Sequence, residues 1–267
     1  MFPILASATI MKLDSYPPCE RLKPYVKQFV VSENSIAQTY KVLPGTSIVM
    51  GFQYTGRLTY LHGQTSTQLA TAGITGLMDN FRLFNNTACT GTILVIFKET
   101  GAAHFLKTPV HELFAESISL DHFFNRDQLA ETEEKLYKAS GTRQRIRIVE
   151  QLLLNHLQEI PEDKMVTEAI NQIKQNNGTM RITQLARYLN TSQSPLEKRF
   201  RKVVGASPKK FSSIVRIGHA LNTLTTTNYQ ETIFLAGYHD QAHFIKDFKA
   251  FTGSTPQQFA KEKTEPK

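Results

Sequence analysis

The sequence of 267 residues has only two cysteines, no tryptophan and no long hydrophobic run. Cys19 and Cys89 stand far apart without metal-ligand spacing, so we expect neither a disulfide framework nor a zinc module. A membrane-spanning helix needs roughly 18 apolar residues, and no run approaches that length. The first residues, MFPILASATI, also lack the positive charge that precedes the apolar part of a secretory signal. We therefore expect a soluble, cytoplasmic protein with no membrane association.

Motifs of catalysis and metal binding are also missing. The sequence contains no Gly-rich phosphate loop, nucleophile elbow or HExxH motif. His239 and His243 have a spacing that can bind zinc on a helix, but no third ligand accompanies them. His62, His104 and His111 do not form the clustered His-x-His of a cupin-like metal site. We expect no metal, no cofactor and no enzymatic activity.

The positive charge is concentrated at one end of the chain. Residues 1–160 carry 15 Lys and Arg against 14 Asp and Glu, a net charge of +1, whereas residues 161–267 carry 16 against 9, a net charge of +7. The length favours two domains, and Pro161, in the PEDK segment, marks the boundary between them. A basic domain joined to a neutral one predicts a polyanionic partner for the basic domain.

The N-terminal region, residues 1–160, is predicted to be strand-rich and then helical. Short segments rich in β-branched residues, separated by glycines, fill residues 38–98 and predict a small barrel or sandwich. Helical patterns follow over residues 109–160, with Pro109 opening the first helix. The expected fold is α+β in this domain, followed by an all-α domain at residues 161–267.

An apolar stripe marks the helix predicted at about residues 143–160. Its members recur at intervals of three and four: Ile146, Val149, Leu153, Leu157 and Ile160. The stripe either packs on its own domain, which we favour, or pairs with a second subunit in a homodimer.

A twelve-residue pattern occurs twice in the C-terminal domain. The segment FRKVVGASPKKF at 200–211 recurs forty-eight residues later as FKAFTGSTPQQF at 248–259. Gly205 and Gly253 hold equivalent places, which favour left-handed helix C-caps. Each is followed by a Ser-Pro or Thr-Pro pair, typical of the N-cap and first position of a new helix. The repeat therefore predicts two equivalent helix ends.

Each copy completes a helix-turn-helix unit. Ser192 and Asp240, again forty-eight residues apart, are suitable N-caps for the helix that precedes each glycine, and another short helix lies upstream of each. The predicted units cover about 181–205 and 228–253. A linker helix at about 207–225 joins them and, with roughly 18 residues, spans about 27 Å, which approaches the roughly 34 Å of one DNA turn.

The segment from about 165 to 261 resembles the DNA-binding domain of AraC/XylS-type transcription regulators. The motif that carries the resemblance is AGYHDQAHFIKDFKAFTGSTPQQF, and Arg216 stands where the family usually has an arginine. The resemblance implies double-stranded DNA and RNA polymerase as partners, and insertion of the second helix of each unit into the major groove. The N-terminal order of strands and helices loosely resembles sensor-like domains of such regulators.

Helix geometry selects the candidate contacts with DNA. Residues opposite the buried edge of each second helix are expected to contact bases: Gln193, Ser194, Glu197, Lys198, Gln241, Ala242, Ile245 and Lys246. Basic residues nearby are expected to contact phosphates: Arg201, Lys202, Lys209, Lys210, Arg216, His243 and Lys249.

The function of the N-terminal domain stays open at this point. A barrel pocket lined by Phe52, Tyr54, Tyr60 and Phe81 would suit an apolar or aromatic effector, and we place this hypothesis slightly ahead. The alternative is a domain that acts only in dimerisation or protein contact. A remote alternative is a DNA alkylation-repair enzyme that carries the same DNA-binding module, but its methyl-acceptor chemistry requires a cysteine cluster that is absent.

Overall fold

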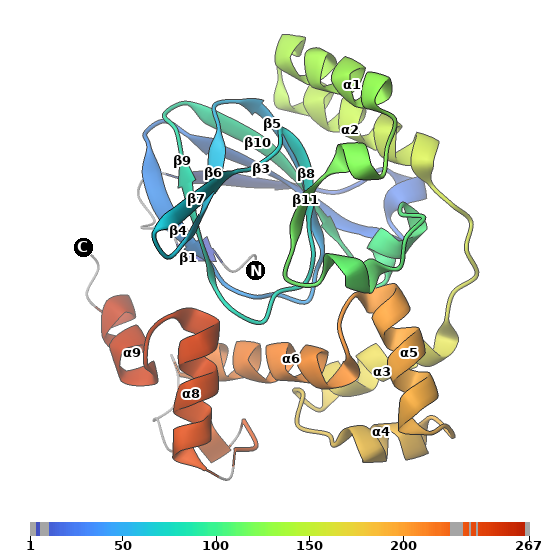
Figure 1. Ribbon diagram of the computed structural model, residues 1–267, viewed down its shortest axis with the longest axis vertical. Coiled ribbons are helices and arrows are strands. Elements are labelled where there is room, and N and C mark those ends of the chain that lie inside the picture. Colours follow the sequence, from blue (N-terminus) through green and yellow to red (C-terminus); the bar gives the residue numbers. More distant parts are fainter. Residues whose placement is uncertain (1–3, 6–10, 225–231, 235, 239, 265–267) are drawn as a thin grey trace.

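The computed structural model of the protein describes residues 4–5, 11–224, 232–234, 236–238 and 240–264 (Figure 1). Its strands are β1 (Ile4–Leu5), β2 (Met11–Tyr16), β3 (Val26–Asn34), β4 (Gln38–Val42), β5 (Val49–Thr55), β6 (Leu58–His62), β7 (Thr65–Gln68), β8 (Ala72–Thr75), β9 (Arg82–Asn86), β10 (Thr90–Phe97) and β11 (Ser117–Ser119). Its helices are α1 (Arg126–Lys138), α2 (Thr142–His156), α3 (Lys164–Gln175), α4 (Ile182–Tyr188), α5 (Gln193–Val204), α6 (Pro208–Thr223), α8 (Gln241–Thr252) and α9 (Pro256–Thr264). Short 3-10 helices are η1 (Glu20–Leu22), η2 (Gly101–His104), η3 (Val110–Leu113) and η4 (Leu120–His122).

The strands form two antiparallel sheets that enclose a barrel-like space. One sheet has the order β1-β4-β9-β6-β7, and the other has the order β11-β8-β5-β10-β3-β2. Figure 1 shows the two sheets facing each other, with α1 and α2 packed on the outer side of the second sheet. This arrangement agrees with the predicted strand-rich N-terminal domain, although strands begin well before residue 38.

The apolar stripe of α2 packs inside its own domain. Ile146, Val149 and Leu153 are all at most 6% exposed and belong to the same buried cluster as the second sheet. The helix ends at His156, and Ile160 lies beyond it at 44% exposure. These three residues therefore pack on their own domain, the alternative that we favoured, and a homodimer through residues 143–160 stays a prediction.

The predicted helix that begins at Pro109 is wrong. Only the 3-10 helix η3 forms there, and the chain then enters strand β11, which pairs with β8. Ala115 has a φ of 60°, a left-handed conformation that ends helical geometry. The pairing with β8 decides this segment, because it gives the backbone of Ser117–Ser119 its hydrogen-bond partners.

The C-terminal domain is all-α over its described residues, as predicted. Gly205 and Gly253 have φ values of 93° and 81°, and both are left-handed C-caps, of α5 and α8 respectively. The Asp240 side chain caps α8 by accepting a hydrogen bond from the Ala242 amide. Ser192 occupies the N-cap of α5 without a side-chain hydrogen bond. The second predicted unit begins at residue 228, which lies outside the described residues.

Two hydrophobic cores support the two predicted helix-turn-helix units. The larger runs without interruption from the barrel into α3, α4 and α5, and includes Phe200 and Phe211. The smaller surrounds α8 and the C-terminal part of α6, with Phe244 and Phe248 at its centre, and it also includes Leu43 from the N-terminal domain. In the part of the chain that the structure describes, no helix is long and apolar enough to cross a membrane.

Candidate nucleic-acid interface

Helix α5 has one buried edge and one exposed face. Leu196, Phe200 and Val204 are fully buried, because they pack against the first unit and the N-terminal domain. The opposite face carries the predicted contact residues, all of which are exposed: Gln193, Ser194, Glu197, Lys198 and Arg201. Within this face, the Arg201 guanidinium lies 3.7 Å from the Glu197 carboxylate. The exposed face of α5 therefore presents amide, hydroxyl, acidic and basic groups together.

Helix α8 repeats this arrangement. Phe244, Phe248 and Phe251 are at most 4% exposed in the smaller core. The predicted contact residues Gln241, Ala242, His243, Lys246 and Lys249 are exposed, whereas Ile245 is half-buried. Both second helices thus present a polar face of the expected composition at equivalent positions of the repeat.

An ion pair joins the first unit to helix α3. The Arg199 guanidinium donates two hydrogen bonds to the Asp163 carboxylate, at 2.8 and 2.6 Å, and Asp163 also caps α3 by accepting from the Val166 amide at 3.1 Å. Burial alone would raise the pKa of Asp163, but the hydrogen bonds from Arg199 and from Val166 outweigh it and keep that pKa below its usual value. Arg199 therefore joins α5 to the start of α3, and it is not among the residues predicted to contact bases.

Arg216 lies in a polar network between α6 and α8. Its guanidinium stacks 4.3 Å from the centre of the Tyr238 ring and approaches the Asp247 carboxylate at 3.8 Å. The Tyr238 hydroxyl donates to the same carboxylate at 2.9 Å, and the His243 ring lies 3.4 Å from it. Burial raises the pKa of Tyr238 well above its usual value. Through these contacts Arg216 connects the linker helix to the second unit, and its side chain is only 24% exposed. Its predicted phosphate contact stays a prediction.

The other predicted phosphate contacts lie at the surface. Lys202, Lys209 and Lys210 are exposed near the junction of α5 and α6. Lys210 forms an ion pair with Asp79 of the N-terminal domain. Lys210 therefore links the C-terminal domain to the N-terminal domain, and part of its charge is neutralised by Asp79.

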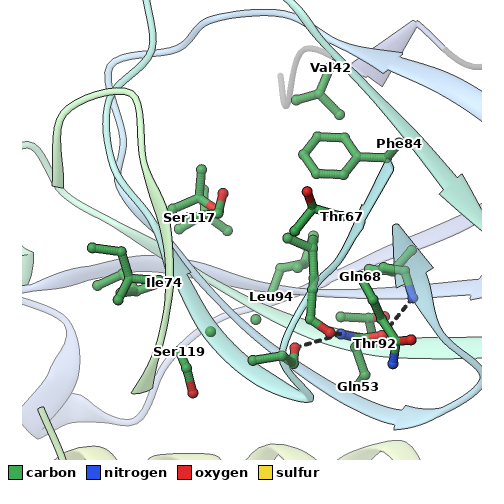
Figure 2. Close-up of a pocket in the computed structure, with 18 of the residues that line it drawn as sticks. Val42, Gln53, Thr67, Gln68, Ile74, Phe84, Thr92, Leu94, Ser117 and Ser119 are labelled. Carbon is green, nitrogen blue, oxygen red and sulfur yellow. Dashed lines mark hydrogen bonds between the residues drawn. The ribbon is translucent and has the colours of Figure 1, made fainter. Parts of the chain in front are cut away.

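The barrel contains a cavity of about 330 Å³ between the two sheets (Figure 2). Its wall is largely apolar, with Val42, Leu58, Ile74, Met78, Phe84, Leu94 and Ile118 among its members. A ligand pocket in the barrel was expected, but Phe52, Tyr54, Tyr60 and Phe81 are not among the residues that line this cavity.

Strand alternation explains the difference on β5. Val49, Gly51 and Gln53 line the cavity, so Phe52 and Tyr54 point to the other face of the sheet. There Phe52 is 1% exposed in the larger core, and the Arg145 guanidinium of α2 stacks 4.1 Å from the Tyr54 ring.

The two remaining aromatics lie elsewhere on the barrel. Tyr60 stacks with the Arg82 guanidinium at 4.8 Å, and Phe81 packs against the smaller core beside α8. The four aromatic residues therefore serve in packing around the barrel.

Hydroxyl groups mark one part of the cavity wall. The Ser117 and Thr75 hydroxyls, both on the wall, lie 2.9 Å apart, and Ser117 Oγ accepts a hydrogen bond of 2.7 Å from Arg82. Only one of the two hydroxyl protons is used in the bond between them, so the other is available to an acceptor. Arg82 itself is 8% exposed, and burial lowers its pKa. Within the described residues it has no carboxylate within ion-pair distance.

Comparisons with known proteins agree with this geometry. Residues 185–262 match the model of a helix-turn-helix domain, and residues 14–119 match that of a domain of unknown function, DUF6597. The C-terminal segment is an AraC-type helix-turn-helix domain. In the AraC-type domain, α5 and α8 are the candidate recognition helices.

Relatives of the AraC-type domain are transcription regulators. The chain is 28% identical over 158 residues to the Msm operon regulatory protein of Streptococcus mutans, covering 57% of this chain and 56% of that protein. It is 32% identical over 96 residues to the raffinose operon transcriptional regulatory protein RafR of Pediococcus pentosaceus, covering 35% of each. The chain thus matches about half and about a third of the length of these relatives. Among solved structures, ToxT from Vibrio cholerae aligns with 94% of this chain and 98% of its own, at a TM-score of 0.45 and 11% identity.

These matches support the expectation that the chain is not an enzyme, since the curated relatives are regulators. Among the described residues, no group of three or more His, Cys, Asp or Glu side chains is placed to hold a metal ion.

Proposed function

We propose that the protein is a transcription regulator that reads two successive major-groove segments of duplex DNA through α5 and α8. The observation that carries the proposal is the repetition of one arrangement: two helices, each with a buried apolar edge and an exposed polar face, lie at the two ends of α6 (Figure 1). The match of residues 185–262 to a helix-turn-helix domain supports DNA as the partner.

The dimensions suit adjacent grooves. Helix α6 has 16 residues and is about 24 Å long at 1.5 Å per residue. Adding half the width of a helix at each end, about 5 Å each, brings the axes of α5 and α8 to about 34 Å, close to one turn of DNA. In this interpretation Lys198 and Lys246 donate to guanine, Gln241 pairs with adenine, and Glu197 accepts from cytosine.

We propose further that the protein acts as an activator in the cytoplasm and contacts RNA polymerase. These points rest on the resemblance of the C-terminal domain to AraC/XylS-type regulators, whose members commonly activate transcription.

For the N-terminal domain we propose that the barrel cavity binds a small effector. A volume of about 330 Å³ is within the range of small-molecule sites. The apolar wall selects an apolar body, and the spare proton of the Ser117–Thr75 pair, with the Arg82 cation behind it, selects an oxygen acceptor such as a carboxylate. The alternative is a domain used only for dimerisation or protein contact, and this alternative would not explain the cavity.

The DNA-reading function is tested by selecting bound sequences from a random duplex library with the purified full chain. We expect two enriched sequence blocks about one helical turn apart. The double variant Lys198→Ala/Lys246→Ala should lose at least tenfold in affinity for the selected DNA, because each base contact contributes about 1–3 kcal/mol. The matched control is Lys135→Ala on α1, which is far from both recognition helices in Figure 1. A wild-type protein that enriches no sequence would contradict the proposal.

A further inference from the structure

The two equivalent glycines of the repeat share a second property: both helix ends rest on the N-terminal domain. A Cβ atom placed on Gly205 would lie 3.2 Å from the Val110 side chain and 3.6 Å from that of Ile48. A Cβ atom placed on Gly253 would lie 2.8 Å from the Phe81 ring and 3.2 Å from Lys41 Nζ. The barrel therefore contacts both recognition helices at the same position of the repeat.

The contact at Gly205, which we name the first docking contact, joins the barrel to the turn between α5 and α6. It consists of Ile48 and Val110 against Gly205, together with the ion pair between Asp79 and Lys210. Val110 is 1% exposed and belongs to the same buried cluster as α5. The first unit and the barrel thus share one hydrophobic core.

The contact at Gly253, which we name the second docking contact, supplies part of the second unit's core. Leu43, just after β4, is 4% exposed and belongs to the smaller core, and Phe81 packs against that core. The ammonium group of Lys41 lies 5.1 Å from the centre of the Phe81 ring. Without the barrel, this side of α8 and its C-cap would be uncovered.

The barrel, the first unit and the second unit are each in contact with the other two: α6 joins the two units, and the two docking contacts join each unit to the barrel. The linker helix sets the distance between the units, and it holds the second unit on one side, through the smaller core and the Arg216 network. Contact with a third body at both helix ends also fixes the rotation of α8 about α6 relative to α5. Figure 1 shows the barrel lying over α6 with α5 and α8 at its two ends.

We infer that the N-terminal domain determines which spacing between the two DNA blocks the protein accepts. The inference rests on the proposed function, since it requires both units to read DNA. Inserting two base pairs between the blocks rotates one groove face relative to the other by about 70° at roughly 10.5 base pairs per turn. A second unit held on both sides, by α6 and by the barrel, cannot follow that rotation, whereas a unit held by α6 alone has one contact surface fewer to resist it.

The test uses the full chain and a duplex library in which the two selected blocks are separated by every spacing over one turn. We expect the wild type to prefer one spacing by about tenfold over spacings two base pairs away. Phe81→Ala, which weakens the second docking contact, should reduce that preference to about twofold and leave the sequence of each block unchanged. Tyr137→Ala is the matched control: this aromatic is 76% exposed on α1, on the opposite side of the barrel, and its removal should leave the preference at tenfold.

A second variant guards against misfolding. Asp79→Lys removes the ion pair with Lys210 and the hydrogen bond that Asp79 accepts from the Asn80 side chain. It also places like charges across the first docking contact, so it should broaden the accepted spacings as well. If both variants keep the wild-type spacing profile, or if the wild type accepts all spacings equally, the inference is wrong although DNA reading stands. If the wild type enriches no block at all, the proposed function itself fails.

Discussion

Arg199 on α5 and Asp163 at the start of α3 are joined by two hydrogen bonds, at 2.8 and 2.6 Å, across thirty-six residues of sequence. The Asp163 side chain is 18% exposed, and its second role as the cap of α3 also restricts its position. This pair connects α5, the candidate recognition helix of the first unit, to the first helix of the domain by a planar, two-point contact.

Acid should weaken the fold through this pair. The pKa of Asp163 is lowered in the folded state, so its contribution is present above the pKa of the unfolded chain and is lost as the pH falls through the lower, folded-state value. We expect the free energy of unfolding to decrease below about pH 4. Asp163→Asn keeps a good cap, and should lower stability at pH 7 by about 1 kcal/mol and flatten the acid dependence.

Urea titrations at pH 7 and pH 3 measure both effects. Glu131→Gln is the control, because Glu131 pairs with Lys135 in an exposed ion pair on α1 and its loss should change little. An Asp163→Asn variant with the wild-type acid dependence would contradict the assignment.

Lys202 and Lys249 are expected to contact phosphates rather than bases. Replacing either with Ala should weaken binding about equally on selected and unselected DNA, and should reduce the slope of log affinity against log salt by about one. Fluorescence anisotropy over a series of salt concentrations gives the slope. A change in the preferred base at one position, with the slope intact, would show a base contact instead.

Arg216 has two competing roles that one variant separates. If it connects α6 to α8 through Tyr238 and Asp247, Arg216→Ala should lower the free energy of unfolding by about 1–2 kcal/mol and leave the salt slope unchanged. If it contacts phosphate, the slope should fall by about one. Thermal denaturation and salt-dependent anisotropy on the same sample decide between them, with Lys249→Ala as the reference for a phosphate contact.

The cavity should respond to apolar acids. We expect octanoate or benzoate to raise the melting temperature of the wild type, because a ligand that binds only the folded state stabilises it, and octanol or benzyl alcohol to raise it less. Gly51→Val should remove the shift, since residue 51 lines the cavity and a Cβ there meets only ordinary contacts, 3.4 Å from Leu94. Ser117→Ala should reduce the shift for the acids, and Ser140→Ala, at an exposed position, should not. Equal shifts in wild type and Gly51→Val would mean that the acids bind elsewhere.

The C-terminal domain could be predicted from the sequence because its signals are local. Gly205 and Gly253 must adopt left-handed conformations at helix ends, and the proline that follows each of them opens the next helix. Such short-range signals predicted the two caps, the linker helix and the exposed faces of α5 and α8.

The cavity wall could not be predicted because both faces of its strands are buried. On β5, Phe52 and Tyr54 face the helices, whereas Gly51 and Gln53 face the cavity. When neither face is polar, the sequence does not show which set of alternate residues faces inward, and a difference of one residue exchanges them. The docking contacts were missed for a related reason: Leu43 and Phe81 are ordinary apolar residues whose partners lie far away in the sequence.

Strand β4 has two occupied sides. Tyr40 and Val42 line the cavity, whereas Lys41 and the next residue, Leu43, contact the second unit. A molecule in the cavity and DNA on α8 would therefore act on one strand from opposite sides. By thermodynamic reciprocity, any factor by which the small molecule changes the affinity for DNA is also the factor by which DNA changes the affinity for the small molecule. The effector would then bind the operator-bound and the free protein with different affinities, so the number of operators in the cell would itself influence how much effector the protein retains.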